Sequence, residues 1–378
     1  MSPQGDTEMP APSNASPRQK AEQTNYLIKE LGSGSYAVVC LSIPRTTADQ
    51  ILEGYTSSPK TRSRKAETLA RLRTNLQAIK IAIGRGVDSI EAEVRILRQL
   101  GEKTKQPSVS KLIDADDSPL SKVWYTMSVC QCGDLDQLLQ LTSGPKAVPL
   151  PVGLAWHICT QLASALLYLH FGWHGGRIEP HWPLMTHEDI WAKNILFRSS
   201  STADEGSSVH YPDAVLADFG KGWFVQRDAA NTQYQDTVLQ RQHRDLQALA
   251  STLIPLAHRL EDSGLCEALI PLERVDRPPK GAKQNVSAYR ALRKFVRLAE
   301  QRRQESYQPL SQELKAHFDR VVVTDAELEQ TFPVLQLTDS PESSPSSGSR
   351  KRRASAENSE EARLGRSTRR KGCQCVTL

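Results

Sequence analysis

The 378-residue chain contains one stretch that restricts its fold and chemistry more than any other, residues 187–194, which read HEDIWAKN. The pattern is H-x-D-x-x-x-x-N, and the apolar segment 195–197 follows it at once. Phosphoryl transfer requires a carboxylate that orients the hydroxyl nucleophile and a nearby ligand for the metal on the phosphates. Asp189 and Asn194 lie on one loop and provide one of each. Because H-x-D also arises by chance, the surrounding motifs decide its significance.

Composition limits the classes of protein to which the chain can belong. With 38% hydrophobic and 24% charged residues, it fits a soluble globular protein with disordered ends. No run of 18 apolar residues is present, which predicts no transmembrane helix, and the polar N-terminus lacks the apolar segment of a secretion signal. The seven cysteines follow no zinc-motif or disulfide spacing, and their odd number fits a reducing, intracellular compartment.

The positive charge of the chain is concentrated in its tail. The net charge is +5, while residues 350–371 contain nine Lys/Arg and three Glu, a surplus of +6, so the remainder is about −1. This distribution predicts a partner for the tail, and no nucleic-acid partner for the folded part.

The first third of the chain predicts a glycine turn between two strands. Residues 1–24 are polar and are expected to be disordered. The strands cover 26–28 and 38–41, and the turn between them contains Gly32 and Gly34, whose backbone N–H groups can close over phosphates. The polar and basic segment 45–74 is expected to be an inserted loop that ends in a helix at 66–73.

A single lysine, Lys80, interrupts the apolar strand 76–82. Burying its charge is costly unless an opposite charge pairs with it. Residues 89–100 form the next predicted element, a helix with apolar residues on one face and Glu93 beside that face. The strand and the helix therefore each carry one charge next to an apolar surface.

The rest of the chain alternates between strands and helices up to residue 335. Strands are predicted at 109–114, 123–129, 195–197 and 214–217, and helices at 151–170, 286–303 and 308–320. A short helix opens after Gly133, and a segment rich in Gly, Trp and His covers 171–186. Its histidines, His174 and His181, are interpreted as surface or packing residues. Asp218-Phe219-Gly220 follows the fourth strand, and Asp245 is predicted to begin an apolar helix.

The chain resembles a eukaryotic protein kinase domain in the order and spacing of six features. They are GSGSYA, AIK, the helix glutamate, HEDIWAKN, DFG and the late aspartate. The resemblance covers about 26–335 and is to a divergent branch, similar to kinase-like proteins of filamentous fungi. It implies an α+β, bilobal fold over 25–335. A small β-rich N-lobe with one regulatory helix would span 25–129, a mainly helical C-lobe would span 130–335, and 336–378 would be a disordered basic tail.

The resemblance implies ATP and Mg²⁺ as ligands. Gly32 and Gly34 would close over ATP, Val39 and Ala78 would enclose the adenine, and Lys80 would hold the phosphates and pair with Glu93. The remaining nucleotide contacts would come from the gatekeeper position and the hinge, at Met127 and Ser128–Cys130.

The resemblance also assigns the catalytic groups. Asp189 would be the catalytic base, and Asn194 and Asp218 the magnesium ligands. Asp245 would hold the backbone of the catalytic loop. A stack of side chains would tie the lobes together, consisting of Leu97, Leu112, His187 and Phe219.

Several residues depart from the family pattern. Ala37 replaces the third glycine of the loop, which is tolerable because the first two make the closest approaches. Glu188 replaces the arginine that receives an activation-segment phosphate, so activity should not depend on phosphorylation there. Trp191 replaces the lysine two residues after the base, and Lys193 is the expected compensating cation. Only 24 residues separate Gly220 from Asp245, without A-P-E, which weakens the case for a protein substrate.

Three functions follow as alternatives. The first is a protein kinase that phosphorylates Ser or Thr of an unidentified protein. The second is a pseudokinase, a scaffold that binds nucleotide without turnover. The third is a small-molecule kinase of the aminoglycoside or choline kinase kind, which uses the same H-x-D-x-x-x-x-N pattern. Survival of both carboxylates, the asparagine and the lysine favours phosphoryl transfer.

The chain ends in Cys375-Val376-Thr377-Leu378, which fits the C-a-a-X pattern, with a final leucine that points to geranylgeranyl. The basic cluster before it, with Cys373 as a palmitoylation site, would supply the second signal that stable anchoring to an anionic membrane surface needs. Three interpretations compete: a cytoplasmic protein associated with membranes, a nuclear protein whose bipartite signal is 351–353 with 369–371, and a ragged basic tail with neither role.

Overall fold

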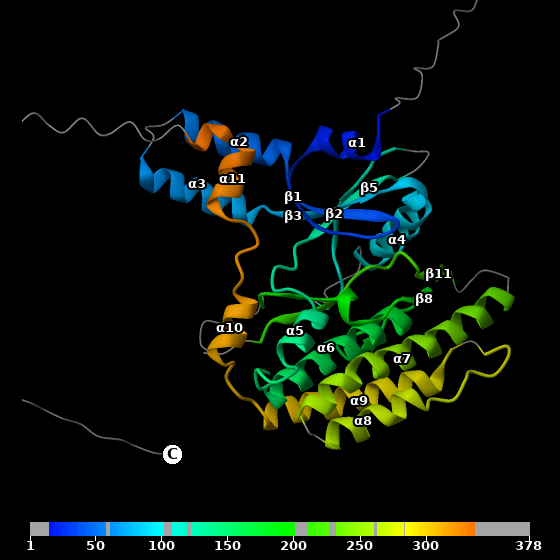
Figure 1. Cartoon of the computed structure of the whole chain (residues 1–378). Coiled ribbons are helices and arrows are strands. Elements are labelled where there is room, and N and C mark those ends of the chain that lie inside the picture. The colour runs from blue at the N-terminus through cyan, green and yellow to red at the C-terminus, as the bar shows by residue number, and fades with distance from the viewer. Residues whose placement is uncertain are drawn as a thin grey trace, which may run out of the picture. The chain divides into compact units, whose positions relative to one another are not determined.

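The computed structural model describes residues 15–57, 61–101, 108–118, 122–200, 211–226, 232–260, 263–282 and 284–336. The chain is a mixed α+β protein in which a five-stranded antiparallel sheet precedes a group of helices (Figure 1). The predictions for 1–14 and for the tail from residue 337 onward, including both of its cysteines, fall outside the described residues.

The sheet has the strand order β1-β2-β3-β5-β4. Its strands are β1 (Asn25–Ser33), β2 (Ala37–Pro44), β3 (Gln77–Ala82), β4 (Leu112–Ala115) and β5 (Trp124–Ser128). Helix α4 (Val87–Gly101) follows β3 through the short turn η1 (Gly84–Gly86), and its apolar face is buried, as predicted. Strand β4 starts later than expected, because Val109 forms a bridge with Leu216 instead.

The prediction of disorder up to residue 24 is wrong for its last part. Residues Pro17–Thr24 form helix α1, and Ser16 and Gln19 make a reciprocal capping box at its start. Ala21 is fully buried in a cluster with residues of the sheet that include Ile79 and Trp124. One small buried side chain in a polar segment gives too weak a pattern to be recognised in the sequence.

The expected loop 45–74 consists of two helices, α2 (Arg45–Thr56) and α3 (Arg62–Thr74). Ile51, Tyr55 and Leu72 are buried although the segment as a whole is polar and basic. They share a hydrophobic cluster with residues 323–335 of the C-terminal part, and helix α11 (Asp325–Thr331) and the turn η3 (Pro333–Gln336) lie there. The helices α2 and α3 and the segment 323–335 thus bury each other's apolar residues in a second core.

Ion pairs at the surface also connect α11 to the sheet and the insert. Lys29 of β1 pairs with Glu327 at 3.0 Å, and Lys65 of α3 pairs with Glu329 at 2.8 Å. The chain thus returns to the sheet after the helical group. Figure 1 shows this return as the orange segment that rises from α10 to α11.

The helical group is built around one buried helix. Its members are α5 (Leu135–Leu141), α6 (Val152–Phe171), α7 (Thr232–Leu260), α8 (Ser263–Glu273), α9 (Val286–Glu305) and α10 (Gln312–Phe318). Helix α6 is long and apolar enough to span a membrane, contrary to the expectation that no such stretch is present, but 78% of that stretch is buried inside the protein. Burial against α9 and its other neighbours accounts for its hydrophobicity.

Short strands place the central loop. The segment 171–186 forms a hairpin of β6 (Trp173–His174) and β7 (Arg177–Ile178), followed by β8 (Leu184–Thr186). The loop 187–194 comes next and ends in the turn η2 (Ala192–Asn194). Two further pairs complete the arrangement: β9 (Ile195–Arg198) with β10 (Asp213–Leu216), and β8 with β11 (Trp223–Val225).

The prediction that Asp245 begins a helix is wrong. Asp245 lies within α7, which starts at Thr232. The part of the helix before it is largely polar, yet Val238 and Leu239 are buried against Leu184 of β8. Two apolar residues among glutamines and arginines were not recognised as a buried face.

Candidate active site

The backbone of the central loop is held by Asp245. Its Oδ2 accepts hydrogen bonds from the N–H of His187 at 2.8 Å and from Nε2 of His170 at 2.9 Å, and its Oδ1 accepts one from the N–H of Glu188 at 2.8 Å. Hydrogen bonds to a buried carboxylate are among the strongest in proteins. The expected role of Asp245 is therefore confirmed, while its partner His170 was not anticipated.

Lys80 joins the sheet to the segment after β10. Its ammonium lies 2.6 Å from Oε2 of Glu93 and 2.8 Å from Oδ1 of Asp218. The other carboxylate oxygen of Glu93 accepts the N–H of Phe219 at 2.8 Å. The expected pairing of Lys80 with Glu93 is confirmed, and Asp218 is a second partner 138 residues away in the chain.

The charges of this cluster support one another. Burial lowers the pKa of Lys80, but Glu93 and Asp218 outweigh it, and the pKa lies above its ordinary value. Burial raises the pKa of Asp218, but the ammonium of Lys80 outweighs it, and the pKa lies below its ordinary value. At neutral pH the lysine is therefore a cation and Asp218 an anion.

The Asp-Phe-Gly segment has an unusual backbone. Asp218 has a φ of 65°, a left-handed conformation that is uncommon for residues other than glycine. Phe219 is fully buried, with its ring 4.6 Å from that of His187, and belongs to the same core as Leu97 and Leu112. The expected stack of four side chains therefore lies in one core. Burial lowers the pKa of His187, so its ring is neutral.

Asp189 has two partners in the structure. Its Oδ1 lies 2.9 Å from the ammonium of Lys221, and its Oδ2 accepts Nδ2 of Asn194 at 3.2 Å. The same amide nitrogen donates to the backbone oxygen of Asp189 at 2.9 Å. Lys221 was missed in the sequence, because nothing in the residues after Gly220 marks it as a partner of the loop.

The structure does not bring Lys193 to Asp189. Its ammonium lies over the ring of Trp191, 5.5 Å from the ring centre. The role expected of Lys193 as a compensating cation stays a prediction, because it concerns a γ-phosphate and not Asp189. Lys221 contacts the carboxylate instead.

The register of the sheet places the expected nucleotide-contacting residues on one face. Val39 is paired with Lys80 and with Gly32, and Ala78 is paired with Met127. Paired residues in antiparallel strands point to the same side, and so do residues two apart. Side chains from three neighbouring strands therefore share the face on which Lys80 reaches Asp218.

The remaining nucleotide-binding predictions fall at the edges of this face. Gly34 closes the turn between β1 and β2 by donating its N–H to the oxygen of Ala37 at 2.9 Å. Ser128 ends β5, and its N–H donates to the oxygen of Lys111 at 3.2 Å. Burial raises the pKa of the Cys130 thiol to about 12, which keeps it protonated at neutral pH.

Glu188, next to Asp189, belongs to a different cluster. Its Oε2 lies 3.1 Å from Arg241 and 3.4 Å from Arg244, both on α7. The guanidinium of Arg241 also covers the ring of Trp223, 3.8 Å from its centre. Both arginines were missed because the helix was expected to begin after them. Burial and Asp245 raise the pKa of Glu188 despite the two arginines.

Asn194 and Asp218 are the two residues that could hold a magnesium ion. Magnesium prefers oxygen ligands and is usually held by one or two protein side chains together with substrate phosphates. Oδ2 of Asp218 and Oδ1 of Asn194 accept no hydrogen bond from the described residues, because the recorded bonds use Oδ1 and Nδ2. Two oxygen atoms thus remain for a cation.

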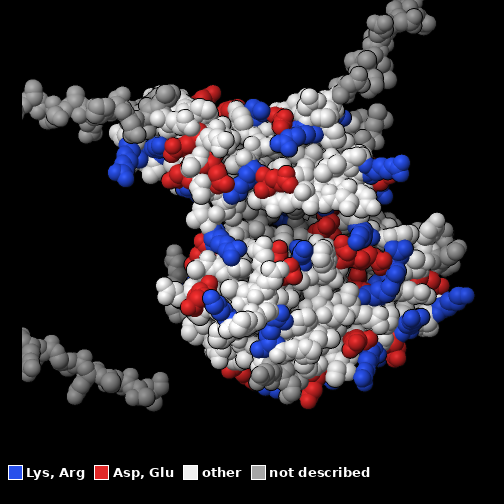
Figure 2. All heavy atoms as spheres, viewed as in Figure 1, with Lys and Arg blue, Asp and Glu red and all other residues white. Residues whose placement is uncertain are grey.

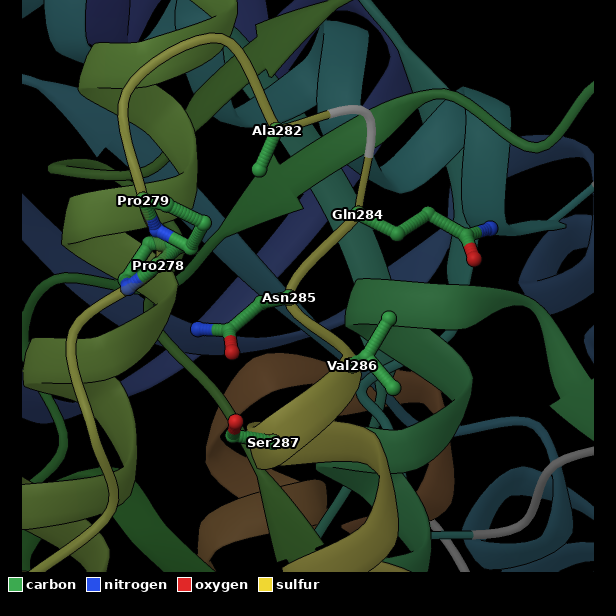
Figure 3. Close-up of a pocket in the computed structure, with 7 residues that line it drawn as sticks. All are labelled: Pro278, Pro279, Ala282, Gln284, Asn285, Val286 and Ser287. Carbon is green, nitrogen blue, oxygen red and sulfur yellow. The ribbon is translucent and has the colours of Figure 1, made fainter.

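A separate hollow of about 590 Å³ lies before α9 (Figure 3). It is lined by Pro278, Pro279, Ala282, Gln284, Asn285, Val286 and Ser287. Oδ1 of Asn285 caps the helix by accepting the N–H of Ala288 at 3.0 Å. None of the predicted site residues lines this hollow.

On the face drawn in Figure 2, acidic and basic side chains are interspersed, and neither sign of charge dominates.

Compared with models of known protein families and with curated proteins, the chain matches none of either. Its residues and their geometry therefore carry the functional argument.

Proposed function

We propose that the chain is a divergent, bilobal protein kinase-like domain that transfers the γ-phosphoryl group of ATP, with Mg²⁺, to Ser or Thr of a protein. The sheet and α4 would form the N-lobe and the helical group the C-lobe. One observation carries the proposal: Lys80 contacts both Glu93 and Asp218, while Asp245 holds the loop that presents Asp189. These contacts join motifs that are far apart in the sequence.

The proposed reaction uses these residues in distinct roles. Lys80 would bind the α- and β-phosphates, and Asp218 and Asn194 would hold a magnesium ion, which would neutralise charge on the phosphates. Asp189 accepts the proton of the substrate hydroxyl as the hydroxyl oxygen bonds to the γ-phosphorus. The bond from that phosphorus to its bridging oxygen breaks, and its electron pair leaves with ADP. Positioning and charge neutralisation supply most of the rate enhancement.

The charge states at neutral pH suit this chemistry. A cationic Lys80 attracts phosphate, and a deprotonated Asp218 can ligate a metal.

A nucleotide-binding scaffold without turnover is the second candidate. It is favoured by the contacts of Asp189, both of whose carboxylate oxygens already have partners, Lys221 and Asn194. Both partners would compete with a substrate hydroxyl for the carboxylate.

The test is transfer of radiolabelled phosphate from ATP by the full-length chain, offered a mixed protein panel and a panel of small alcohols. Transfer of label to protein by the wild type, and loss of that transfer in Asp218→Asn, would support the proposal. Asp276→Asn, a change at an exposed loop carboxylate, is the matched control and should behave as wild type. Labelled alcohol without labelled protein would favour a small-molecule kinase. ATP binding without transfer to either panel would favour the scaffold.

A further inference from the structure

The proposed site lacks one cation that the kinase resemblance implies. Trp191 occupies the position of the lysine that would contact the γ-phosphate, and the ammonium of Lys193 lies over that tryptophan. We propose that Lys221, directly after the Asp-Phe-Gly segment, is the γ-phosphate-binding cation of this site. The inference rests on the proposed function and adds a residue to it.

The position of Lys221 carries the inference. Its ammonium lies 2.9 Å from Oδ1 of Asp189, the group that would orient the attacking hydroxyl. The γ-phosphate must lie next to that hydroxyl at the moment of transfer. A cation that reaches Asp189 therefore also reaches the space in which the phosphate would lie.

The backbone that carries Lys221 is fixed on both sides. A Cβ at Gly220 would lie 2.6 Å from Oγ of Ser89, and one at Gly222 would lie 2.7 Å from the backbone oxygen of Thr186. The N–H of Gly222 also donates to the oxygen of Phe219 at 2.9 Å. Close packing of both glycines holds the turn in place, while the side chain of Lys221 itself is 64% exposed.

An exposed lysine on a fixed turn can change partner. Lysine has a flexible stem and three donors, so its ammonium can leave one oxygen acceptor for another without backbone movement. In the structure it pairs with Asp189. With magnesium and ATP bound, it would turn to the oxygens of the γ-phosphate and release Asp189 for the substrate hydroxyl.

The experiment compares ATP and ADP affinity in the full-length protein, because only ATP carries the γ-phosphate. Loss of one charge-assisted contact should weaken ATP binding about tenfold in Lys221→Ala and leave ADP binding unchanged. Lys221→Arg retains the charge and should keep most of the affinity difference. Lys315→Ala, at an exposed lysine of α10, should match wild type. Turnover should fall in Lys221→Ala together with ATP affinity.

Three results would overturn the inference and leave the proposed function intact. One is a Lys221→Ala protein that transfers phosphate and discriminates ATP from ADP as wild type does. Another is loss of that discrimination in Lys193→Ala but not in Lys221→Ala. A rise in turnover in Lys221→Ala would also overturn it, by showing that the pair with Asp189 is only inhibitory. A wild-type protein that binds neither nucleotide would end both proposals.

Discussion

Asp189 and Glu188 are neighbours in the chain, yet they face different surroundings. The side chain of Asp189 is 26% exposed and contacts the side chain of Lys221, which is 64% exposed. The side chain of Glu188 is 13% exposed and contacts two arginines of α7. The left-handed backbone of Glu188, with a φ of 64°, separates the two side chains. One residue thus faces the proposed site, and the next holds α7.

The difference shows how a charge can be reversed without loss of its structural role. In the kinase pattern, an arginine at position 188 would bind an activation-segment phosphate. Here the anion is on the loop, and the cations are Arg241 and Arg244 on the following helix. Opposite charges attract equally well when they exchange places. The helix that follows Asp-Phe-Gly is therefore tied to the loop without a phosphate.

The largest effect is expected on the chemical side of this comparison. Asp189→Asn should lower turnover by about 10²–10⁴-fold, the usual contribution of a general base. The free energy of unfolding should change by no more than about 0.5 kcal/mol, because Asp189 is partly exposed and asparagine keeps its shape. Steady-state kinetics and urea unfolding measure the two quantities. A much lower free energy of unfolding in Asp189→Asn than in wild type would show that Asp189 has a structural role instead.

The structural side should respond differently. Glu188→Gln removes the carboxylate from Arg241, but the pair is only partly buried and burial of the Glu188 charge outweighs its attraction to the arginines, so the free energy of unfolding should change by no more than about 1 kcal/mol. Arg244, 61% exposed, has less to lose, and Arg244→Ala should cost about 0.5 kcal/mol or less. Urea unfolding gives both values.

Exchange of the charges tests whether the pair itself matters. Glu188→Arg places like charges together and should destabilise the protein more than Glu188→Gln. Adding Arg241→Glu to Glu188→Arg should restore part of the stability, measured as the coupling energy of a double-mutant cycle. A coupling energy near zero would mean that the ion pair between positions 188 and 241 does not contribute to stability.

The two sides should also differ in the sign of their pH dependence. The pKa of Asp218 is lowered on folding, so its contribution to stability is present above the ordinary value of 3.8 and is lost as pH falls through the lower folded pKa. The pKa of Glu188 is raised, so its contribution is present below the ordinary value of 4.5 and is lost as pH rises through the higher folded pKa. Unfolding of wild type, Asp218→Asn and Glu188→Gln across this range measures both trends. Parallel trends would contradict the assignment.

The smallest effect is the one expected from phosphatase treatment. Glu188 would repel a phosphate on Thr232, Tyr234 or Thr237, and the arginines already have a carboxylate partner. Activity should therefore be the same before and after treatment, measured on protein purified from its native cells. Loss of activity would show that a phosphate is needed after all.

The sequence predicted the polar contacts of the site better than the elements that surround it. Lys80, Glu93, Asp218 and Asp245 lie in motifs of fixed spacing, and burial of such charges requires partners. The structure gives Lys80, Glu93 and Asp245 their expected partners, and it adds Asp218 as a second partner of Lys80. A charged side chain in a short segment with a strong sequence pattern has few other partners that it could contact.

Other parts could not be predicted, because the information lies in distant segments. The apolar faces of α2 and α3 are completed by residues 323–335, and neither segment shows a clear pattern alone. Lys221 carries no motif, and its role depends on the turn made by two glycines. The contacts of Arg241 and Arg244 were missed because the helix was predicted to start at Asp245. Helix α7 starts thirteen residues earlier, at Thr232.

The most direct test of the account is the magnesium dependence of ATP binding, measured by calorimetry on the full-length protein. If Asp218 and Asn194 hold the metal on the phosphates beside Lys80, ATP should bind more tightly with Mg²⁺ than with a chelator. Asp218→Asn should remove that difference, and Asp276→Asn should keep it. ATP binding that is indifferent to Mg²⁺ in wild type, or a magnesium effect that survives in Asp218→Asn, would contradict the account.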